Sequence, residues 1–100
     1  MVIKWSNFAQ ENLKDFAGHS KLSSPTSYVK ELVKSVYILE DFPQAGKLRF
    51  YYQETEVRQL VHKMHRIIYR ISNNEIIIGA VLHNSQDLDT SLKFMNRFFK

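Results

Sequence analysis

The sequence VRQLVHKMHRIIYRISNNEIIIGAVLH, residues 57–83, decides the fold because it has the pattern of three consecutive β-strands. Residues that favour strands recur in 57–63, 65–71 and 76–82. The polar tetrapeptide at 72–75 is typical of a hairpin connection, since asparagine tolerates a positive φ. Residues 76–82 are apolar on both faces, as a central strand would be. The stretch therefore predicts an antiparallel sheet.

The strand at 65–71 predicts which face of that sheet is buried. Its apolar side chains at 67, 69 and 71 share one face, which we expect to pack against helices. Arg66 and Arg70 flank Ile68 on the other face. If the alternation continues through the next strand, His83 shares the face of the two arginines. The residues with the same parity as His83 are Ile77, Gly79 and Val81.

Residues before this stretch predict a strand and a helical hairpin. Residues 2–5 alternate apolar and polar side chains, which predicts a short opening strand. A helix capped by Ser6 or Asn7 follows. A second helix begins at Ser24-Pro25, because serine accepts hydrogen bonds from free N–H groups and proline fits a first helical turn. Both helices carry apolar residues at helical spacing.

A further strand is expected at 47–52, and a last helix after His83. The last helix has an apolar stripe formed by Leu88, Leu92, Met95 and Phe99. The predicted fold class is α+β, with an N-terminal strand, a helical hairpin, a three- to four-stranded antiparallel sheet and a C-terminal helix. The 100 residues suffice for one domain with its own core, and we expect residues 1–100 to form it.

The excess positive charge of the chain is concentrated on this sheet. Between positions 47 and 70 there are two acidic residues and six basic ones, namely Lys47, Arg49, Arg58, Lys63, Arg66 and Arg70. Their balance of +4 equals the formal net charge of the whole chain. Cations gathered on one sheet indicate an anionic partner, either nucleic acid or an acidic protein segment. The candidate anion-binding residues are Arg49, Arg58, Arg66 and Arg70.

Composition excludes several classes of protein. The chain has no cysteine, so it has no disulfide framework, no cysteine-based zinc site and no catalytic thiol. No segment approaches the roughly 20 apolar residues that cross a bilayer, and the N-terminus does not resemble a signal peptide. His62 and His65 are spaced too loosely across a predicted bend for a metal site, so we expect them to lie at the surface or to pair. We expect a cytoplasmic protein without membrane, metal or cofactor.

Several motifs in order along the chain resemble the RelE/ParE superfamily of bacterial type II toxins. They are VIKWS at 2–6, FPQAGK at 42–47, VRQLV at 57–61, HRIIYRI at 65–71 and IIIGAVLH at 76–83 with DL at 87–88. The resemblance covers residues 2–88. It implies a RelE/ParE-like fold and a toxin that forms a hetero-oligomer with a cognate antitoxin. It also implies one of two activities, either ribosome-dependent mRNA cleavage, as in RelE-like members, or poisoning of DNA gyrase, as in ParE-like members.

Ribonuclease chemistry without a metal needs a base for the 2′-hydroxyl, an acid for the leaving oxygen and cations for the phosphate. The candidates for these roles are Arg58, Lys63, Arg66, Arg70 and His83. After His83, however, the chain has Ser-Gln-Asp-Leu at 85–88, where many ParE-like relatives have two arginines and RelE-like ribonucleases tend to have basic groups and a tyrosine. No tyrosine follows Tyr69, which weakens the mRNA-cleavage hypothesis. The last helix and the remaining His…Asp-Leu favour ParE and gyrase.

Two further hypotheses concern partners. A non-toxic nucleic-acid-binding module would need exposed aromatic residues among its cations, and residues 50–52 beside Arg49 fit that loosely. Core packing of Phe50 and Tyr52 is the interpretation that we favour. The apolar stripe Leu88, Leu92, Met95 and Phe99, which a small sheet does not fully bury, is a candidate antitoxin-binding surface together with Arg66 and Arg70.

Overall fold

The computed structural model describes residues 1–19, 25–86 and 98–99. Its elements, in chain order, are β1 (Val2–Trp5), α1 (Asn7–His19), α2 (Pro25–Ser35), the 3₁₀ helix η1 (Tyr37–Glu40), β2 (Lys47–Tyr52), β3 (Thr55–His62), β4 (His65–Ser72) and β5 (Glu75–His83). The predicted opening strand, helical hairpin and antiparallel strands are confirmed. Leu88, Leu92 and Met95, which carry most of the predicted C-terminal stripe, lie outside the described residues.

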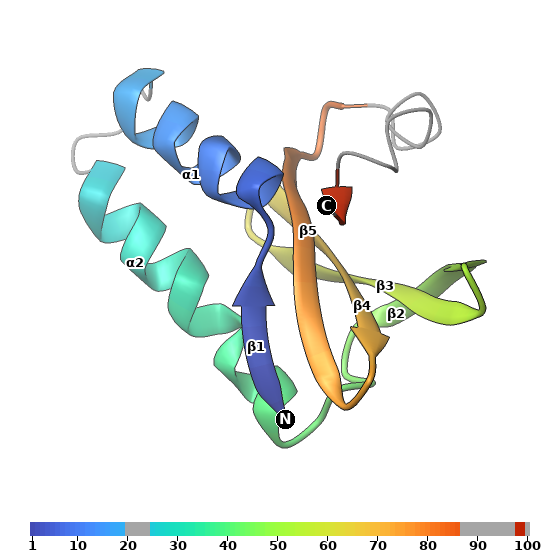
Figure 1. Cartoon of the computed structure of the whole chain (residues 1–100). Helices are drawn as coiled ribbons and strands as arrows, with labels where there is room; N and C mark the ends of the chain where they lie inside the picture. Colours follow the sequence, from blue (N-terminus) through green and yellow to red (C-terminus); the bar gives the residue numbers. More distant parts are fainter. Residues whose placement is uncertain (20–24, 87–97, 100) are drawn as a thin grey trace.

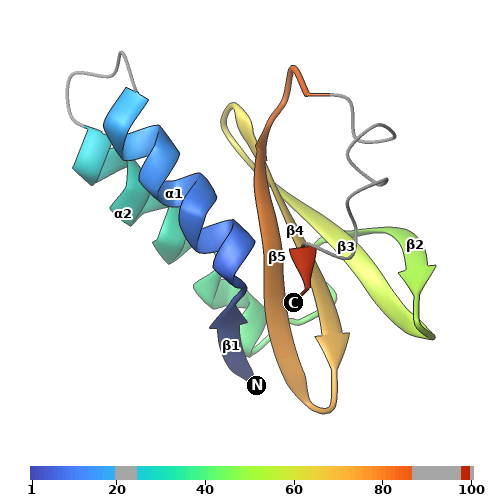
Figure 2. The same ribbon diagram turned by 45° about the horizontal axis from the view of Figure 1, so that its top comes forward.

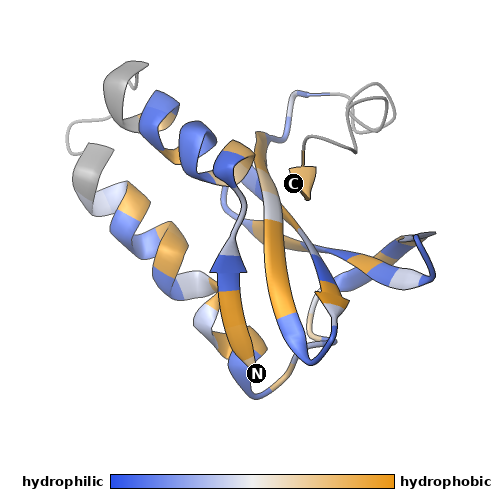
Figure 3. Ribbon diagram, in the orientation of Figure 1, coloured by the Kyte–Doolittle hydropathy of each residue, from blue (hydrophilic) through white to orange (hydrophobic). Residues whose placement is uncertain are grey.

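The strands form one five-stranded sheet in the order β1-β5-β4-β3-β2. Strands β2 to β5 are antiparallel neighbours, as predicted. The opening strand adds to this sheet as a fifth member, because β1 pairs with β5 in parallel, from Val2 opposite Glu75 to Trp5 opposite Ile78. Strand β5 is therefore an interior strand with a neighbour on each side, which agrees with its hydrophobic character along most of its length (Figure 3).

The helices cover one face of the sheet, here called the helix face, and the described C-terminal residues lie against the other, here called the opposite face (Figures 1 and 2). The core of the helix face consists of Ala9, Leu32, Val36, Leu39, Ile67, Tyr69, Ile76, Ile78 and Val81. The core of the opposite face consists of Val57, Ile68, Ala80, Leu82 and Phe98. The prediction that residues 67 and 69 face the helices is confirmed.

Ser6 links the start of α1 to strand β5 through hydrogen bonds. Its Oγ accepts a hydrogen bond from the N–H of Ala9 at 3.1 Å, which caps α1, and donates one to the carbonyl of Gly79 at 2.8 Å. Its own N–H donates to the carbonyl of Ile78 at 2.9 Å. The start of α1 is therefore fixed on the helix face of β5, beside the strand that precedes it.

A β-bulge in β5 changes the face on which its last residues lie. Ile68 pairs with Ala80 but Tyr69 pairs with Ile78, so Gly79 is the extra residue. Ile78 and Val81 both pack on the helix face, although they are three residues apart. The expectation that His83 shares a face with Arg66 and Arg70 is therefore wrong. His83 lies beside His65 on the helix face, because the extra residue inverts the alternation.

Two hairpin turns both have a positive φ at their two central residues, but their sequences differ. Asn73 and Asn74 connect β4 to β5 with φ of 52° and 62°, as expected of asparagine. Gln53 and Glu54 connect β2 to β3 with φ of 50° and 63°. Such residues seldom adopt this conformation, which costs roughly 1–2 kcal/mol for residues with a Cβ. The β2–β3 turn is thus held by its flanking strands rather than by its own residues.

Candidate partner-binding face

Arg66 and Arg70 of β4 lie on the opposite face, as the alternation predicted. Arg66 donates from Nε to Oδ1 of Asn84 and from Nη2 to the Asn84 carbonyl, both at 3.3 Å. Arg70 donates from Nη1 to Oε1 of Gln53 at 3.4 Å. No described carboxylate forms an ion pair with either guanidinium. Their positive charges are therefore available to an anionic group on this face.

Aromatic rings surround Arg70. Its guanidinium carbon lies 5.2 Å from the ring centre of Phe99 and 5.7 Å from that of Tyr52, within the range of cation–π attraction. These two rings are themselves 6.0 Å apart. Tyr52 and Phe50 pack against the core of the opposite face, so the predicted packing role of both is confirmed. Attraction to the two rings therefore helps to hold the guanidinium on this face.

Two polar atoms on this face lack a described partner. Arg70 Nε and the side-chain oxygen of Gln59 are both buried, and no described group hydrogen-bonds to them. Gln59 lies on β3 opposite Ile68 of β4, and Arg70 lies opposite Val57. An unsatisfied buried polar atom costs about 1–3 kcal/mol, so a ligand that supplied an acceptor and a donor here would recover that free energy.

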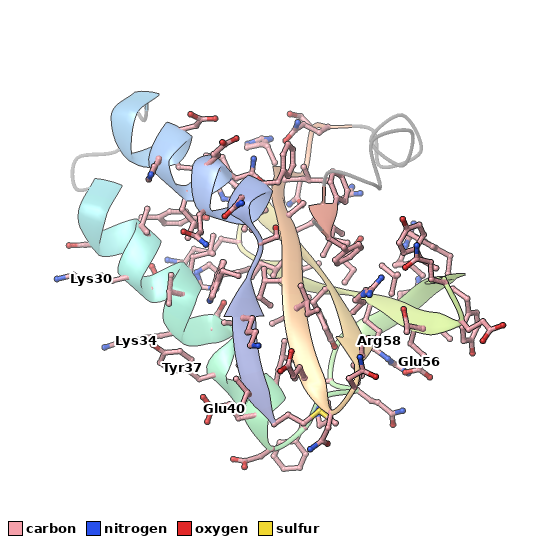
Figure 4. The ribbon with its side chains drawn as sticks, in the orientation of Figure 1. Lys30, Lys34, Tyr37, Glu40, Glu56 and Arg58 are labelled. Atoms are coloured by element: carbon pink, nitrogen blue, oxygen red, sulfur yellow. The ribbon has the colours of Figure 1, made fainter. Side chains whose placement is uncertain are left out.

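Arg58 lies on the helix face, apart from the other two arginines. Its Nε pairs with Glu56 Oε2 at 3.0 Å, and its Nη1 donates to the carbonyls of Gly46 at 2.7 Å and Gln44 at 3.3 Å. Figure 4 shows Arg58 beside Glu56. The hydrogen bond from Arg58 lowers the pKa of the Glu56 carboxyl. The side chain is only 13% exposed, so its charge is occupied within the fold.

Tyr69 also binds the loop at residues 43–46, whose carbonyls at Gln44 and Gly46 accept hydrogen bonds from Arg58. Its hydroxyl donates to the carbonyl of Pro43 at 2.8 Å and accepts from the N–H of Gly46 at 2.9 Å. A side chain at position 46 would collide with the Tyr69 ring, which explains the glycine. Burial raises the pKa of the Tyr69 hydroxyl. Arg58 and Tyr69 together fix residues 43–46, where the chain leaves η1 and enters β2.

The remaining sequence candidates lie in different parts of the molecule. Arg49 is exposed on β2, at the irregular step between residues 48 and 50. Lys63 lies in the β3–β4 turn and pairs with Glu31 of α2 at 2.7 Å. His83 ends β5, and its Nδ1 lies 2.7 Å from Ser85 Oγ. The five ribonuclease candidates thus lie on both sides of the sheet, with Arg66 and Arg70 on the opposite face and Arg58, Lys63 and His83 on the helix face.

His62 and His65 pair across β3 and β4, which agrees with the expected pairing role. In the described part of the chain, no group of three histidine, aspartate or glutamate residues is arranged to hold a metal ion. Within the same residues no helix is long and apolar enough to span a membrane.

Sequence reasoning missed the groups that position the two arginines. Asn84 fixes Arg66 and also donates from Nδ2 to the carbonyl of Lys63 at 3.1 Å. Gln53 accepts a hydrogen bond from Arg70, and Gln59 lies on β3 two residues from Val57, the residue opposite Arg70. No local pattern marks these three polar residues, but a correct cross-strand register would have placed Gln59 near Arg70.

Comparisons with known proteins agree with this architecture. The family model described as ParE toxin of type II toxin-antitoxin system, parDE, matches residues 3–88, which include every strand from β2 to β5. This chain belongs to the ParE toxin family. A similar solved structure is described as the chromosomal ParDE TA system from P. aeruginosa. At a TM-score of 0.66 and 18% identity, the match covers 83% of this chain and 95% of that one. That likeness supports the ParE fold. A comparison with curated proteins gives no match.

Proposed function

We propose that this member of the ParE family is the toxin of a type II pair, acting in the cytoplasm by inhibiting DNA gyrase and neutralised by a cognate antitoxin. The observation that carries the proposal is the family match over residues 3–88. It spans the described sheet and both helices rather than one short motif. No cofactor or metal is part of the proposal.

The antitoxin would cover the opposite face. Arg66 and Arg70 offer positive charge there without a described carboxylate partner, and the aromatic rings of Phe99 and Tyr52 lie beside Arg70. A segment that combines acidic and apolar side chains and folds on binding fits this chemistry. The C-terminal stripe Leu88, Leu92, Met95 and Phe99 would add to the same surface.

Gyrase is favoured over the ribosome because of where the ribonuclease candidates lie. Acid–base cleavage needs its proton-transfer groups and cations within hydrogen-bond reach of one phosphate. Arg58 is occupied by Glu56 and two carbonyls, and Arg70 lies on the other side of the sheet from His83. Inhibition of a protein target requires surface complementarity and not that convergence.

The first experiment adds the purified toxin to DNA gyrase and relaxed plasmid. We expect loss of supercoiling or accumulation of cleaved DNA, and we expect the cognate antitoxin to restore supercoiling. The control is the same assay with the toxin–antitoxin complex assembled beforehand, which should have no effect. Full supercoiling at a large excess of free toxin would contradict the gyrase assignment.

The ribonuclease alternative makes the opposite demand and is tested by mapping mRNA ends on translating ribosomes after induction. If the protein were such a ribonuclease, the mRNA would be cut at the same position within successive codons. Arg70→Ala and His83→Ala would each lower cleavage by roughly two orders of magnitude, as expected when a charge-stabilising or acid–base group is removed. We expect intact messages instead. Codon-phased cuts that vanish in these variants would overturn the gyrase proposal.

A further inference from the structure

Three of the four histidines of the chain lie on one rung of the sheet. His62 of β3 pairs in register with His65 of β4, which pairs in register with His83 of β5. Directly opposite residues of antiparallel strands have Cβ atoms about 4.5–5.5 Å apart. The ring centres of His65 and His83 are 5.4 Å apart. We call these three residues the histidine rung, and a charge on one of them acts on its neighbours.

The histidine rung is the surface against which the helical hairpin packs at this end of the sheet. The ring of Phe16 in α1 lies 4.3 Å from that of His65, and the ring of Tyr28 in α2 lies 5.3 Å from it. The Tyr28 hydroxyl and His65 Nδ1 are hydrogen-bonded at 2.6 Å. Only 6% of His65 is exposed. In Figure 2 the β3–β4 turn, which lies between His62 and His65, reaches toward the helices.

The charges that face the rung nearly cancel at neutral pH. From α2, Glu31 lies 3.6 Å from His62 Nε2 and 2.7 Å from Lys63 Nζ. Tyr28 is the other titratable group of α2 in contact, and its ring also lies 5.9 Å from that of His62. Among its described side chains, α1 contributes the uncharged ring of Phe16. Neutral histidines thus leave one carboxylate balanced by one ammonium.

Acidification removes that balance. Protonating His65 adds a positive charge to the middle of the rung, and Glu31, which contacts His62 and Lys63, is the one described carboxylate in contact with this group. Like charges directly opposite one another destabilise a pair of strands. Burial, and then repulsion from His83 and His62, lower the pKa of His65. A charged His65 carries a proton on Nδ1, so in that state the Tyr28 hydroxyl accepts this hydrogen bond.

We propose that the histidine rung is a pH-controlled latch, which holds the α1–α2 hairpin on the sheet at neutral pH and loosens it below about pH 6.5. The sign follows from linkage. The folded protein binds fewer protons than the unfolded chain when a histidine pKa is lowered by folding. The stabilisation is fully present above the unfolded histidine pKa and is lost as the pH falls through the folded pKa.

The test measures urea unfolding of the full chain at pH 7.5 and pH 5.5, with amide hydrogen exchange of α1 and α2 at both values. If folding lowers the pKa of one histidine by one unit, the unfolding equilibrium constant rises by up to about tenfold between these two pH values. We expect an increase of up to about tenfold at pH 5.5, with exchange in α1 and α2 rising more than in β4 and β5. An unfolding constant and helix exchange that do not change with pH would overturn the latch.

Two matched variants assign the effect to the rung. Glu31→Gln removes the carboxylate beside His62 and should enlarge the loss of stability at pH 5.5. Glu75→Gln removes a carboxylate from a comparable ion pair, with Lys4 at 3.0 Å, at the other end of β5, and should keep the wild-type pH dependence. Equal pH dependence of the two variants would overturn the proposal. His65→Gln, where it folds, should flatten the dependence.

Discussion

At the scale of single residues, polar side chains of the helix face are used to hold the backbone. Tyr69 is fully buried, yet its hydroxyl satisfies one carbonyl and one N–H of the loop at 43–46. Arg58, which the sequence marks as a candidate anion-binding residue, satisfies two more carbonyls of the same loop. A cation in a basic stretch is therefore not automatically part of a binding surface.

Tyr69→Phe should lower the free energy of unfolding by about 1–3 kcal/mol, because it leaves the buried N–H of Gly46 without its acceptor. Tyr51→Phe is the matched control, since Tyr51 is 65% exposed and its change should stay within about 0.5 kcal/mol. Urea unfolding of both variants measures the difference. Equal effects at the two positions would mean that the loop is held by other contacts.

The same hydroxyl predicts a limit of stability at high pH. Burial raises the folded-state pKa of Tyr69, so its contribution is fully present below the unfolded tyrosine pKa of about 10 and is lost as the pH rises above it. Tyr69→Phe should therefore lose less stability than the wild type between about pH 9.5 and pH 11. Unfolding curves across this range test it, and parallel pH profiles would count against it.

At the scale of elements, the two hairpin turns differ in how well their residues suit them. Asn73 and Asn74 favour the conformation that they adopt, whereas Gln53 and Glu54 do not. Gln53 also accepts a hydrogen bond from Arg70 on the opposite face. The β2–β3 turn thus keeps strained residues beside the candidate partner-binding face, while the β4–β5 turn at the same end of the sheet is locally favoured.

Glu54→Gly should raise the free energy of unfolding by about 0.5–1 kcal/mol, because glycine removes the Cβ clash at positive φ and loses only part of that gain to chain entropy. Asn74→Gly, at the corresponding position of the other turn, should change it by only a few tenths of that amount. Thermal or urea unfolding measures both. A destabilised Glu54→Gly would show that this glutamate makes a favourable contact.

At the scale of the whole molecule, the sheet separates two kinds of charge. The helix face uses its cations in ion pairs, those of Arg58 with Glu56 and of Lys63 with Glu31. The opposite face also has one ion pair, that of Lys4 with Glu75, but its Arg66 and Arg70 have no described carboxylate partner. The excess of positive charge that the sequence places between 47 and 70 is therefore presented chiefly on the side that the helices leave open.

Arg66→Glu combined with Arg70→Glu should weaken antitoxin binding by at least about tenfold in Kd, a loss of about 1.4 kcal/mol. The loss should be largest at low salt, because screening shortens charge attraction to about 8 Å at physiological ionic strength. Titration calorimetry at two salt concentrations measures it.

The control for that experiment is Lys30→Glu combined with Lys34→Glu. It changes the net charge by the same amount, and both lysines point away from the sheet on the exposed side of α2 (Figure 4). We expect this variant to bind the antitoxin almost as the wild type does. Equal weakening in the two double variants would show that total charge, rather than the opposite face, governs binding.

Features that depend on residues close together in the chain could be predicted from the sequence alone. Alternation placed Ile67 and Tyr69 against the helices and Arg66 and Arg70 away from them, and the asparagine pair marked the β4–β5 turn. The ordered motifs also indicated the toxin superfamily, which the match to the ParE family over residues 3–88 confirms. These features follow from side-chain period and turn chemistry, which are local properties of the chain.

Features that depend on residues far apart in the chain became evident from the three-dimensional structure. The bulge at Gly79, where an added Cβ would collide with the ring of Phe99, inverted the alternation and moved His83 to the helix face. The pairing of β1 with β5 and of His62, His65 and His83 in one rung likewise needs a register that no single strand contains. The two-residue alternation of side chains predicts which face of the sheet each residue lies on. Packing between strands decides where a bulge interrupts that alternation.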